Sequence, residues 1–259
     1  MSEVITTTSL KTLFKFPLQG PNWQSRFLIG AALTFANFLV PIVPTIFVSG
    51  YVLQLMRRAI EGEELALPEW DNWGRLATDG LRMMLIGLVY LLPGMLVFWG
   101  GMILYLVSSV VLPMLAAGEG HRATVVLPLL VMFSMGIMFL SMMLGSILTL
   151  LGAIPLPVAT AHFAAQDKVA AAFRLREWWP LLRVNKLGYF ISWVIVAGLG
   201  AILYFVLMIA YYSLVLCCLI PLLSAPIGFY LSLVSTALFG QTYRESLALL
   251  PASEQVTSG

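Results

Sequence analysis

The chain has 259 residues, of which 60% are hydrophobic and 10% are charged, and its net charge is +2. A soluble domain carries about 25% charged residues, and a chain of this length could not hide so much apolar surface in a water-soluble core. The small net charge gives no electrostatic signature for nucleic-acid binding. The composition, with a mean hydropathy of +0.95, predicts an integral membrane protein without a nucleic-acid partner.

The first 22 residues are rich in Ser and Thr and carry Lys11 and Lys15, but they contain no compact apolar stretch before a small-residue cleavage site. This pattern predicts an uncleaved cytoplasmic segment over residues 1–22 rather than a signal peptide. We expect a single helical membrane domain over residues 23–245 and a flexible C-terminal tail over residues 246–259.

Four long apolar blocks follow, and none contains Asp, Glu, Lys or Arg. Each exceeds the ~20 residues that a helix needs to cross a bilayer, and the alternation of a membrane β-barrel is absent. Buried charges usually mark proton relays and ion-coupled transport, so their absence argues against a proton-coupled pump. The blocks are Phe27–Met56, Met83–Ala117, Ala123–Ala165 and Leu187–Gly240.

The first block contains Pro41 and Pro44, and it could form one kinked crossing or a short hairpin. With a hairpin, Arg122 is the one basic residue that faces outward. A single crossing would also move Lys11, Lys15 and Arg26 outward. The positive-inside rule therefore favours the hairpin, whose short arms would make it re-entrant or would thin the bilayer.

The second and third blocks are expected to form a hairpin that turns at Gly118–Arg122, and the fourth block to turn near Tyr211–Ser213. Ser141 and Gly145, like Ala197 and Ala201, have the spacing that lets helices approach closely. The predicted fold is an all-α polytopic membrane protein with about six membrane-embedded helices as three hairpins. We expect it in the inner (plasma) membrane with both termini cytoplasmic.

Two connectors between the blocks are predicted to be amphipathic and interfacial. Gln166–Lys186 mixes basic and aromatic residues and suits a helix among anionic headgroups, which Pro180 should break or kink. In Arg57–Arg82, Gly62 is expected to end one helix, and Asp71 or Asn72 to cap a short second one. The predicted interface residues are Trp23, Trp70, Trp73, Arg174, Arg176, Trp178 and Trp179.

The connectors also resemble each other, because Gly80 follows Trp70 at the same spacing as Gly188 follows Trp178. The segment at Trp23, before the first block, resembles this pattern less closely. We hypothesise a weak threefold repeat of an interfacial Trp segment followed by a helical hairpin. Such repeats occur in proteins that build a central pathway, although simple duplication also produces them.

A few polar residues lie in the apolar blocks and are candidates to line an intramembrane cavity. His162 could in principle ligate a metal, but no acidic or Cys partner is near in sequence, and the adjacent Cys217 and Cys218 lack further ligands. No nucleotide-binding or hydrolase motif occurs, so we expect no enzyme activity, no metal and no cofactor. The cavity candidates are Asn37, Ser49, Gln54, Thr160 and His162.

Several short motifs resemble the uncharacterised membrane family known as domain of unknown function 4013. They are Phe16-Pro17, Trp23, the Arg26-to-Gly30 stretch, Gly50-Tyr51, the LPEWDNWG segment at residues 67–74, and Asp79-Gly80. The resemblance covers about residues 14–245 and implies a helical membrane protein. It implies no activity and no catalytic residues.

Two functions remain open. The first is a transport or permeation component, or an accessory subunit, for an uncharged or lipid-like solute, which should show a cavity lined by Asn37, Gln54 and His162. The second is a non-catalytic membrane scaffold that binds a partner through its interfacial helices, with tightly packed hairpins and Trp side chains at headgroup level. Expected partners are membrane lipids with anionic headgroups at the cytoplasmic face, together with a second copy or another protein.

Overall fold

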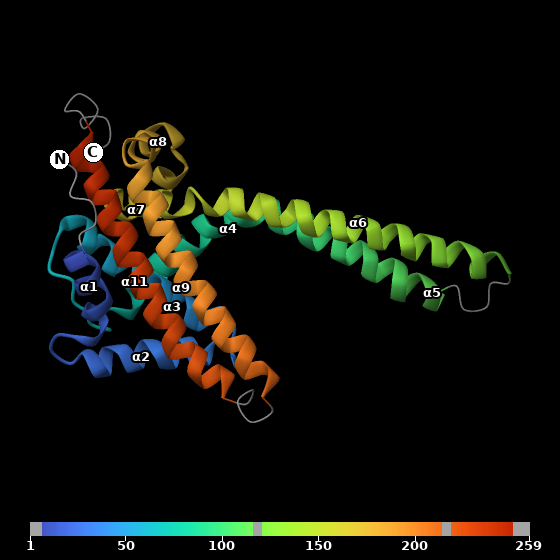
Figure 1. Ribbon diagram of the computed structural model, residues 1–259, viewed down its shortest axis with the longest axis horizontal. Helices are drawn as coiled ribbons and strands as arrows, with labels where there is room; N and C mark the ends of the chain where they lie inside the picture. Colours follow the sequence, from blue (N-terminus) through green and yellow to red (C-terminus); the bar gives the residue numbers. More distant parts are fainter. Residues whose placement is uncertain (1–6, 116–120, 214–218, 251–259) are drawn as a thin grey trace. The chain divides into compact units, whose positions relative to one another are not determined.

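The structure is a computed structural model that describes residues 7–115, 121–213 and 219–250, and in these ranges it contains helices and no strand (Figure 1). The predicted turn at Gly118–Arg122 lies largely outside the described residues, and the pair Cys217–Cys218 lies wholly outside them. The helices are α1 (Thr7–Lys15), the 3-10 turn η1 (Phe16–Leu18), α2 (Trp23–Ala36), α3 (Val43–Glu61), α4 (Trp73–Leu106), the π-helical η2 (Val107–Val111), α5 (Leu112–Leu115), α6 (His121–Ala153), α7 (Leu156–Gln166), the 3-10 helix η3 (Val169–Phe173), α8 (Leu175–Val184), α9 (Lys186–Tyr212) and α11 (Ile220–Leu249).

The chain divides into two compact units. The first unit contains the residues up to Ile86 and those from Pro157 onward, and the second contains Gly87–Leu156. Helix α4 therefore begins in the first unit and continues into the second. The predicted membrane domain, residues 23–245, includes parts of both units, and its boundaries stay a prediction.

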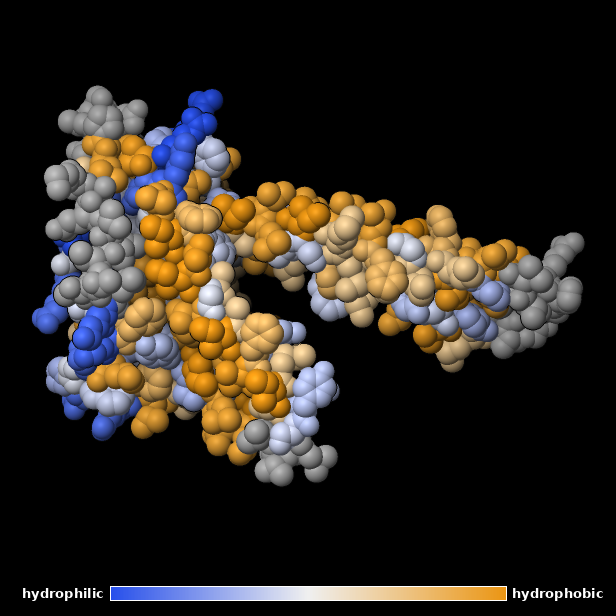
Figure 2. Space-filling model, viewed as in Figure 1, coloured by the Kyte–Doolittle hydropathy of each residue, from blue (hydrophilic) through white to orange (hydrophobic). Residues whose placement is uncertain are grey.

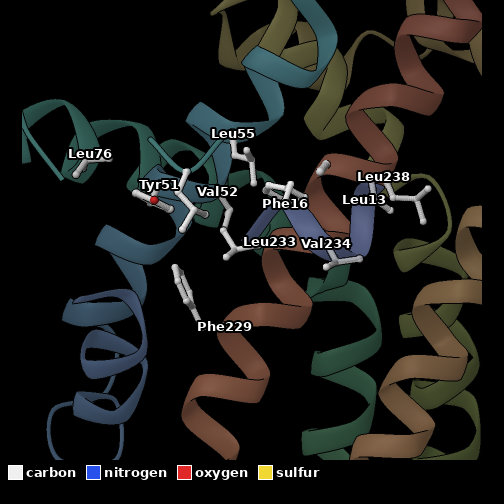
Figure 3. Close-up of a cluster of buried hydrophobic side chains, with 12 residues drawn as sticks. Leu13, Phe16, Tyr51, Val52, Leu55, Leu76, Phe229, Leu233, Val234 and Leu238 are labelled. Carbon is white, nitrogen blue, oxygen red and sulfur yellow. The ribbon is translucent and has the colours of Figure 1, made fainter. Parts of the chain in front are cut away.

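The core of the first unit forms where α11 packs against α2, α3 and α9. Tyr51, Val52 and Leu55 of α3 lie beside Phe229 and Leu233 of α11, and all five are buried (Figure 3). Aromatic and branched side chains on two facing helices fill this space at close packing, which gives the unit its apolar centre.

Both predicted end segments contain buried residues. Leu13 and Phe16 are buried in the core, and the Tyr230 hydroxyl donates a hydrogen bond to the Phe14 carbonyl at 2.7 Å. At the other end, α11 runs to Leu249 and Ser246 is buried, so the helix continues four residues into the range expected to be a tail. Leu13 and Phe16 of the predicted N-terminal segment are thus part of the core, and its cytoplasmic location stays a prediction.

The first apolar block forms a hairpin. Helices α2 and α3 are separate and pack against each other. Arg26 at the start of α2 donates a hydrogen bond to the carbonyl of Leu67, which follows the end of α3. The two open ends of the block therefore lie together, and the alternative of a single kinked crossing is wrong.

In the part of the chain that the structure describes, four helical stretches are long and apolar enough to cross a membrane, and neither α2 nor α3 is among them. Six crossings are therefore not confirmed. Helices α9 and α11 run side by side, which confirms the third hairpin (Figure 1). The four stretches are Trp73–Leu115, Val126–Gln166, Lys186–Tyr212 and Ile220–Leu249.

The second unit is a helical hairpin closed along a seam of small residues. A Cβ added at Gly152 would lie 2.2 Å from the Tyr90 carbonyl oxygen, and one added at Gly101 would lie 2.3 Å from Ser141 Cβ. A Cβ added at Gly145 would lie 2.7 Å from Phe98, so the spacing of Ser141 and Gly145 marks a true helix contact. The hairpin has one buried seam, and Figure 2 shows hydrophobic residues over its outer face, as lipid solvation requires.

The same spacing does not mark a helix contact at Ala197 and Ala201, which are exposed on α9 rather than packed against another helix.

The connectors also differ from expectation. Gly62 caps α3 with a φ of +77°, as predicted, but residues 63–72 contain no short second helix. Asn72 instead caps the long helix α4 by accepting from the Arg75 backbone N–H. Helix α8 continues through Pro180.

Candidate functional site

The polar ends of the helices of the first unit meet in a network of charges. Asp79, near the start of α4, is 3% exposed and accepts a 2.5 Å hydrogen bond from Arg57 of α3. Arg57 also donates to Asp167, just after α7, at 2.8 Å. A buried carboxylate needs such partners because removing a charge from water is costly. These hydrogen bonds hold the ends of α3, α4 and α7 next to one another.

Two further arginines surround the same carboxylates. Arg75 Nε lies 3.7 Å from Asp79, and Arg82 Nη1 lies 3.9 Å from both Asp79 and Asp167. Both arginine side chains are more than 40% exposed, so water weakens their attraction to Asp79. Three arginines against two aspartates leave this part of the surface positive.

A second polar cluster joins α7, α8 and α11 around His162. The ring of His162 is fully buried, and its Nδ1 lies 2.8 Å from the Tyr243 hydroxyl. Its Nε2 lies 3.2 Å from Glu177 Oε2 and 3.0 Å from the Gln166 side chain. Both ring nitrogens therefore have hydrogen-bond partners.

The His162 cluster joins α7, α8 and α11 through buried contacts. Its ring has no exposed surface, and no group of three metal-ligating side chains occurs in the part of the chain that the structure describes. Hydrogen bonds from His162 and Arg174 hold the pKa of Glu177 below its usual value. The carboxylate of Glu177 thereby fastens α8 to the bundle.

The stability that Glu177 contributes by binding α8 to the bundle should depend on pH. Because the folded-state pKa of Glu177 is lowered from 4.5, its stabilisation is present above that pH and is lost as the pH falls further, through the lowered pKa. The groups facing the carboxylate are His162, Arg174 and Tyr243. We expect the difference in thermal unfolding midpoint between the wild-type chain and Glu177→Gln to shrink from pH 6 to pH 3. A difference that stays constant over this range would contradict the role of Glu177.

Helix α8 buries one face and exposes the other. Trp178 and Leu181 are fully buried, and the Trp178 indole donates to the Ala172 carbonyl at 3.0 Å. Leu175 and Trp179 are exposed, and the Arg183 guanidinium lies 5.4 Å from the Trp179 ring centre. Trp178 therefore packs inside the protein and does not face the headgroups, in contrast to the expectation for that residue.

The other predicted interface residues fall into two groups. Arg174 and Arg176 are exposed near the start of α8. Trp23 and Trp70 pack partly buried against the core of the first unit. Trp70 stacks on Tyr51 at a ring-centre distance of 4.0 Å, and Trp73 lies 5.7 Å from Trp70. The LPEW segment thus packs against the core of the first unit through Trp70.

Four of the predicted polar residues of the apolar blocks make hydrogen bonds or are half-buried. Asn37 accepts a hydrogen bond from Thr45, and Thr160 donates to the Pro157 carbonyl. Ser49 and Gln54 are half-buried on α3. The structure has an open cavity of about 510 Å³ at the start of α2 and an apolar groove of about 250 Å³ between α9 and α11, and none of the five candidates lines either.

Sequence reasoning missed the residues that carry the two polar clusters. Asp79 was noticed as part of a motif, but its burial between arginines was not expected. Glu177 and Tyr243 are the partners of His162, at separations of 15 and 81 residues. No local pattern marks such pairs, since they depend on how the helices pack.

Comparison with known proteins places the chain in a family without adding an activity. A family described as "Protein of unknown function (DUF4013)" matches residues 33–212. No curated protein and no solved structure matches the chain. The matched range includes the LPEW segment, Asp79 and the His162–Glu177 pair, and it ends before α11. The chain therefore belongs to the DUF4013 family, and it is an all-helical protein with membrane-compatible helices.

Proposed function

We propose that this protein is a non-catalytic membrane scaffold that presents α8 to anionic lipid headgroups and to a protein partner or a second copy. The observation that carries the proposal is the two-sided character of α8. Its buried face is anchored by Trp178 and Glu177, while its outer face offers Leu175, Trp179 and Arg183. An anchored helix with an apolar and basic outer face suits the headgroup region.

The gathered charges support the proposed topology. Arg57, Asp79 and Asp167 lie together, as they would if the ends of α3, α4 and α7 share one side of the membrane. Basic residues concentrate on the cytoplasmic side of inner-membrane proteins, so we assign this side to the cytoplasm. Both termini would then be cytoplasmic, with α2 and α3 as a re-entrant hairpin whose apolar tip is exposed at Phe38–Val43.

The second candidate is a transport or permeation component for an uncharged or lipid-like solute. The apolar groove between α9 and α11 favours it, because Leu199, Val206 and Ile227 line a space suited to an acyl chain. Asn37, Gln54 and His162 are not among the residues that line this groove. We favour the scaffold because the burial and charge of the two faces of α8 support it directly.

Cysteine labelling tests the scaffold proposal. In a background without Cys217 and Cys218, we expect Leu175→Cys to react with a membrane-impermeant maleimide about tenfold more slowly in vesicles containing phosphatidylglycerol than in phosphatidylcholine alone. The reason is that Arg176 and Arg183 each gain about 1 kcal/mol near anionic lipid, which draws α8 into the headgroups.

Glu64→Cys is the matched control, because Glu64 is exposed in the segment at 63–72 and should react equally in both lipids. Equal rates for Leu175→Cys would contradict the lipid-facing role of α8. Labelling of Glu64→Cys in inside-out vesicles alone would support the cytoplasmic assignment. Faster glycerol-driven swelling of vesicles that contain the protein would favour transport instead.

A further inference from the structure

The open cavity at the start of α2 has a lining of mixed charge. Its volume is about 510 Å³, and it is walled on one side by α2 and on the other by the LPEW segment. Arg26 supplies one positive charge, and Glu69 and Asp71 supply two negative charges. The remaining lining residues are Asn22, Ser25, Ile29 and Trp70.

The walls of this cavity are held in place before any ligand arrives. Arg26 donates to the Leu67 carbonyl at 2.6 Å and to Glu69 at 2.5 Å. The Trp70 indole donates to the Arg26 carbonyl at 2.7 Å, and the Tyr51 hydroxyl donates to the Pro68 carbonyl at 2.9 Å. A cavity with fixed walls binds without the entropic cost of ordering them.

We propose that this cavity binds the headgroup of a zwitterionic phospholipid with a primary ammonium, such as phosphatidylethanolamine. The ammonium would donate to the carboxylates of Glu69 and Asp71. The phosphate would accept from the Ser25 hydroxyl and from the N–H groups of Arg26 that Leu67 and Glu69 leave available. An anionic headgroup fits less well, because the lining already carries one excess negative charge.

The surface next to the cavity favours a lipid over a soluble zwitterion. Ile29 lines the cavity one turn along α2, and Leu28 beside it is 65% exposed. Phe35 and Phe38 continue this apolar flank toward the hairpin tip. Acyl chains could follow α2 from the cavity into the bilayer, whereas a soluble zwitterion would gain nothing from this surface. The site is distinct from the outer face of α8, so it can be tested independently of the scaffold proposal.

Native mass spectrometry of the full chain, released from nanodiscs with equal phosphatidylethanolamine, phosphatidylcholine and phosphatidylglycerol, tests this assignment. We expect the wild-type chain to retain phosphatidylethanolamine about tenfold over the other two lipids. Asp71→Asn should remove most of this preference, because it deletes a charged acceptor for the ammonium. Asp71 makes no ion pair within the described residues, so the variant should keep the wild-type unfolding midpoint.

The matched control is Glu64→Gln, which removes a carboxylate from the same connector outside the cavity and should leave the preference unchanged. Equal retention of phosphatidylcholine would overturn the assignment, because a choline group has no N–H to donate. An unchanged preference in Asp71→Asn would overturn it as well. Displacement of the lipid by soluble glycerophosphoethanolamine would show that the acyl chains contribute nothing and would overturn the choice of a membrane lipid.

Discussion

Replacing Trp178 with alanine is expected to lower the free energy of unfolding by about 3–5 kcal/mol, because a large buried side chain would leave a cavity that the helices cannot fill. Trp178 is the largest of the fully buried side chains and anchors the inner face of α8. Its indole also donates a hydrogen bond to the Ala172 carbonyl, and the substitution removes this bond. Thermal and denaturant unfolding of the full chain in detergent, followed by tryptophan fluorescence, measures the change.

Trp179→Ala is the matched control for this substitution. Trp179 is the next residue in the chain, has the same side chain and is 42% exposed. We expect it to change the free energy of unfolding by less than about 1 kcal/mol. If the two variants were equally destabilised, the orientation assigned to α8 would be wrong, and the scaffold proposal would lose the observation on which it rests.

Replacing Asp79 with asparagine is expected to cost about 3 kcal/mol of unfolding free energy. The substitution keeps the size of the side chain but removes the negative charge that faces Arg57, whose own side chain is only 11% exposed. A buried cation that loses its partner is strongly destabilising, and Asp167 compensates in part because it still pairs with Arg57. The same unfolding measurement at neutral pH reports the loss.

Asp167→Asn separates burial from charge in the same network. Asp167 contacts the same arginine but is 62% exposed, so water already weakens its interaction. We expect a cost below about 1 kcal/mol for this variant. A larger effect for Asp167→Asn than for Asp79→Asn would mean that the end of α7, rather than the start of α4, governs the stability of the network.

The sequence alone was sufficient to predict the membrane-compatible helices and the places where individual helices end. Charge-free apolar stretches require lipid whatever their arrangement, and Gly62 ends α3 through its own backbone freedom. The break near Pro41 and Pro44 also follows from local chemistry, because proline lacks the N–H that a continuing helix needs. The charge pattern further favoured the hairpin over a single crossing before the structure showed it.

Only the tertiary structure decided which side chains meet. Arg57 and Asp167 are 110 residues apart, and His162 and Tyr243 are 81 apart, so no periodic pattern can pair them. The same holds for α8, where Trp178 and Trp179 are adjacent and chemically identical, yet one is buried and the other is exposed. Helix formation depends on neighbouring residues, whereas the choice of buried face depends on the surfaces that other helices bring to it.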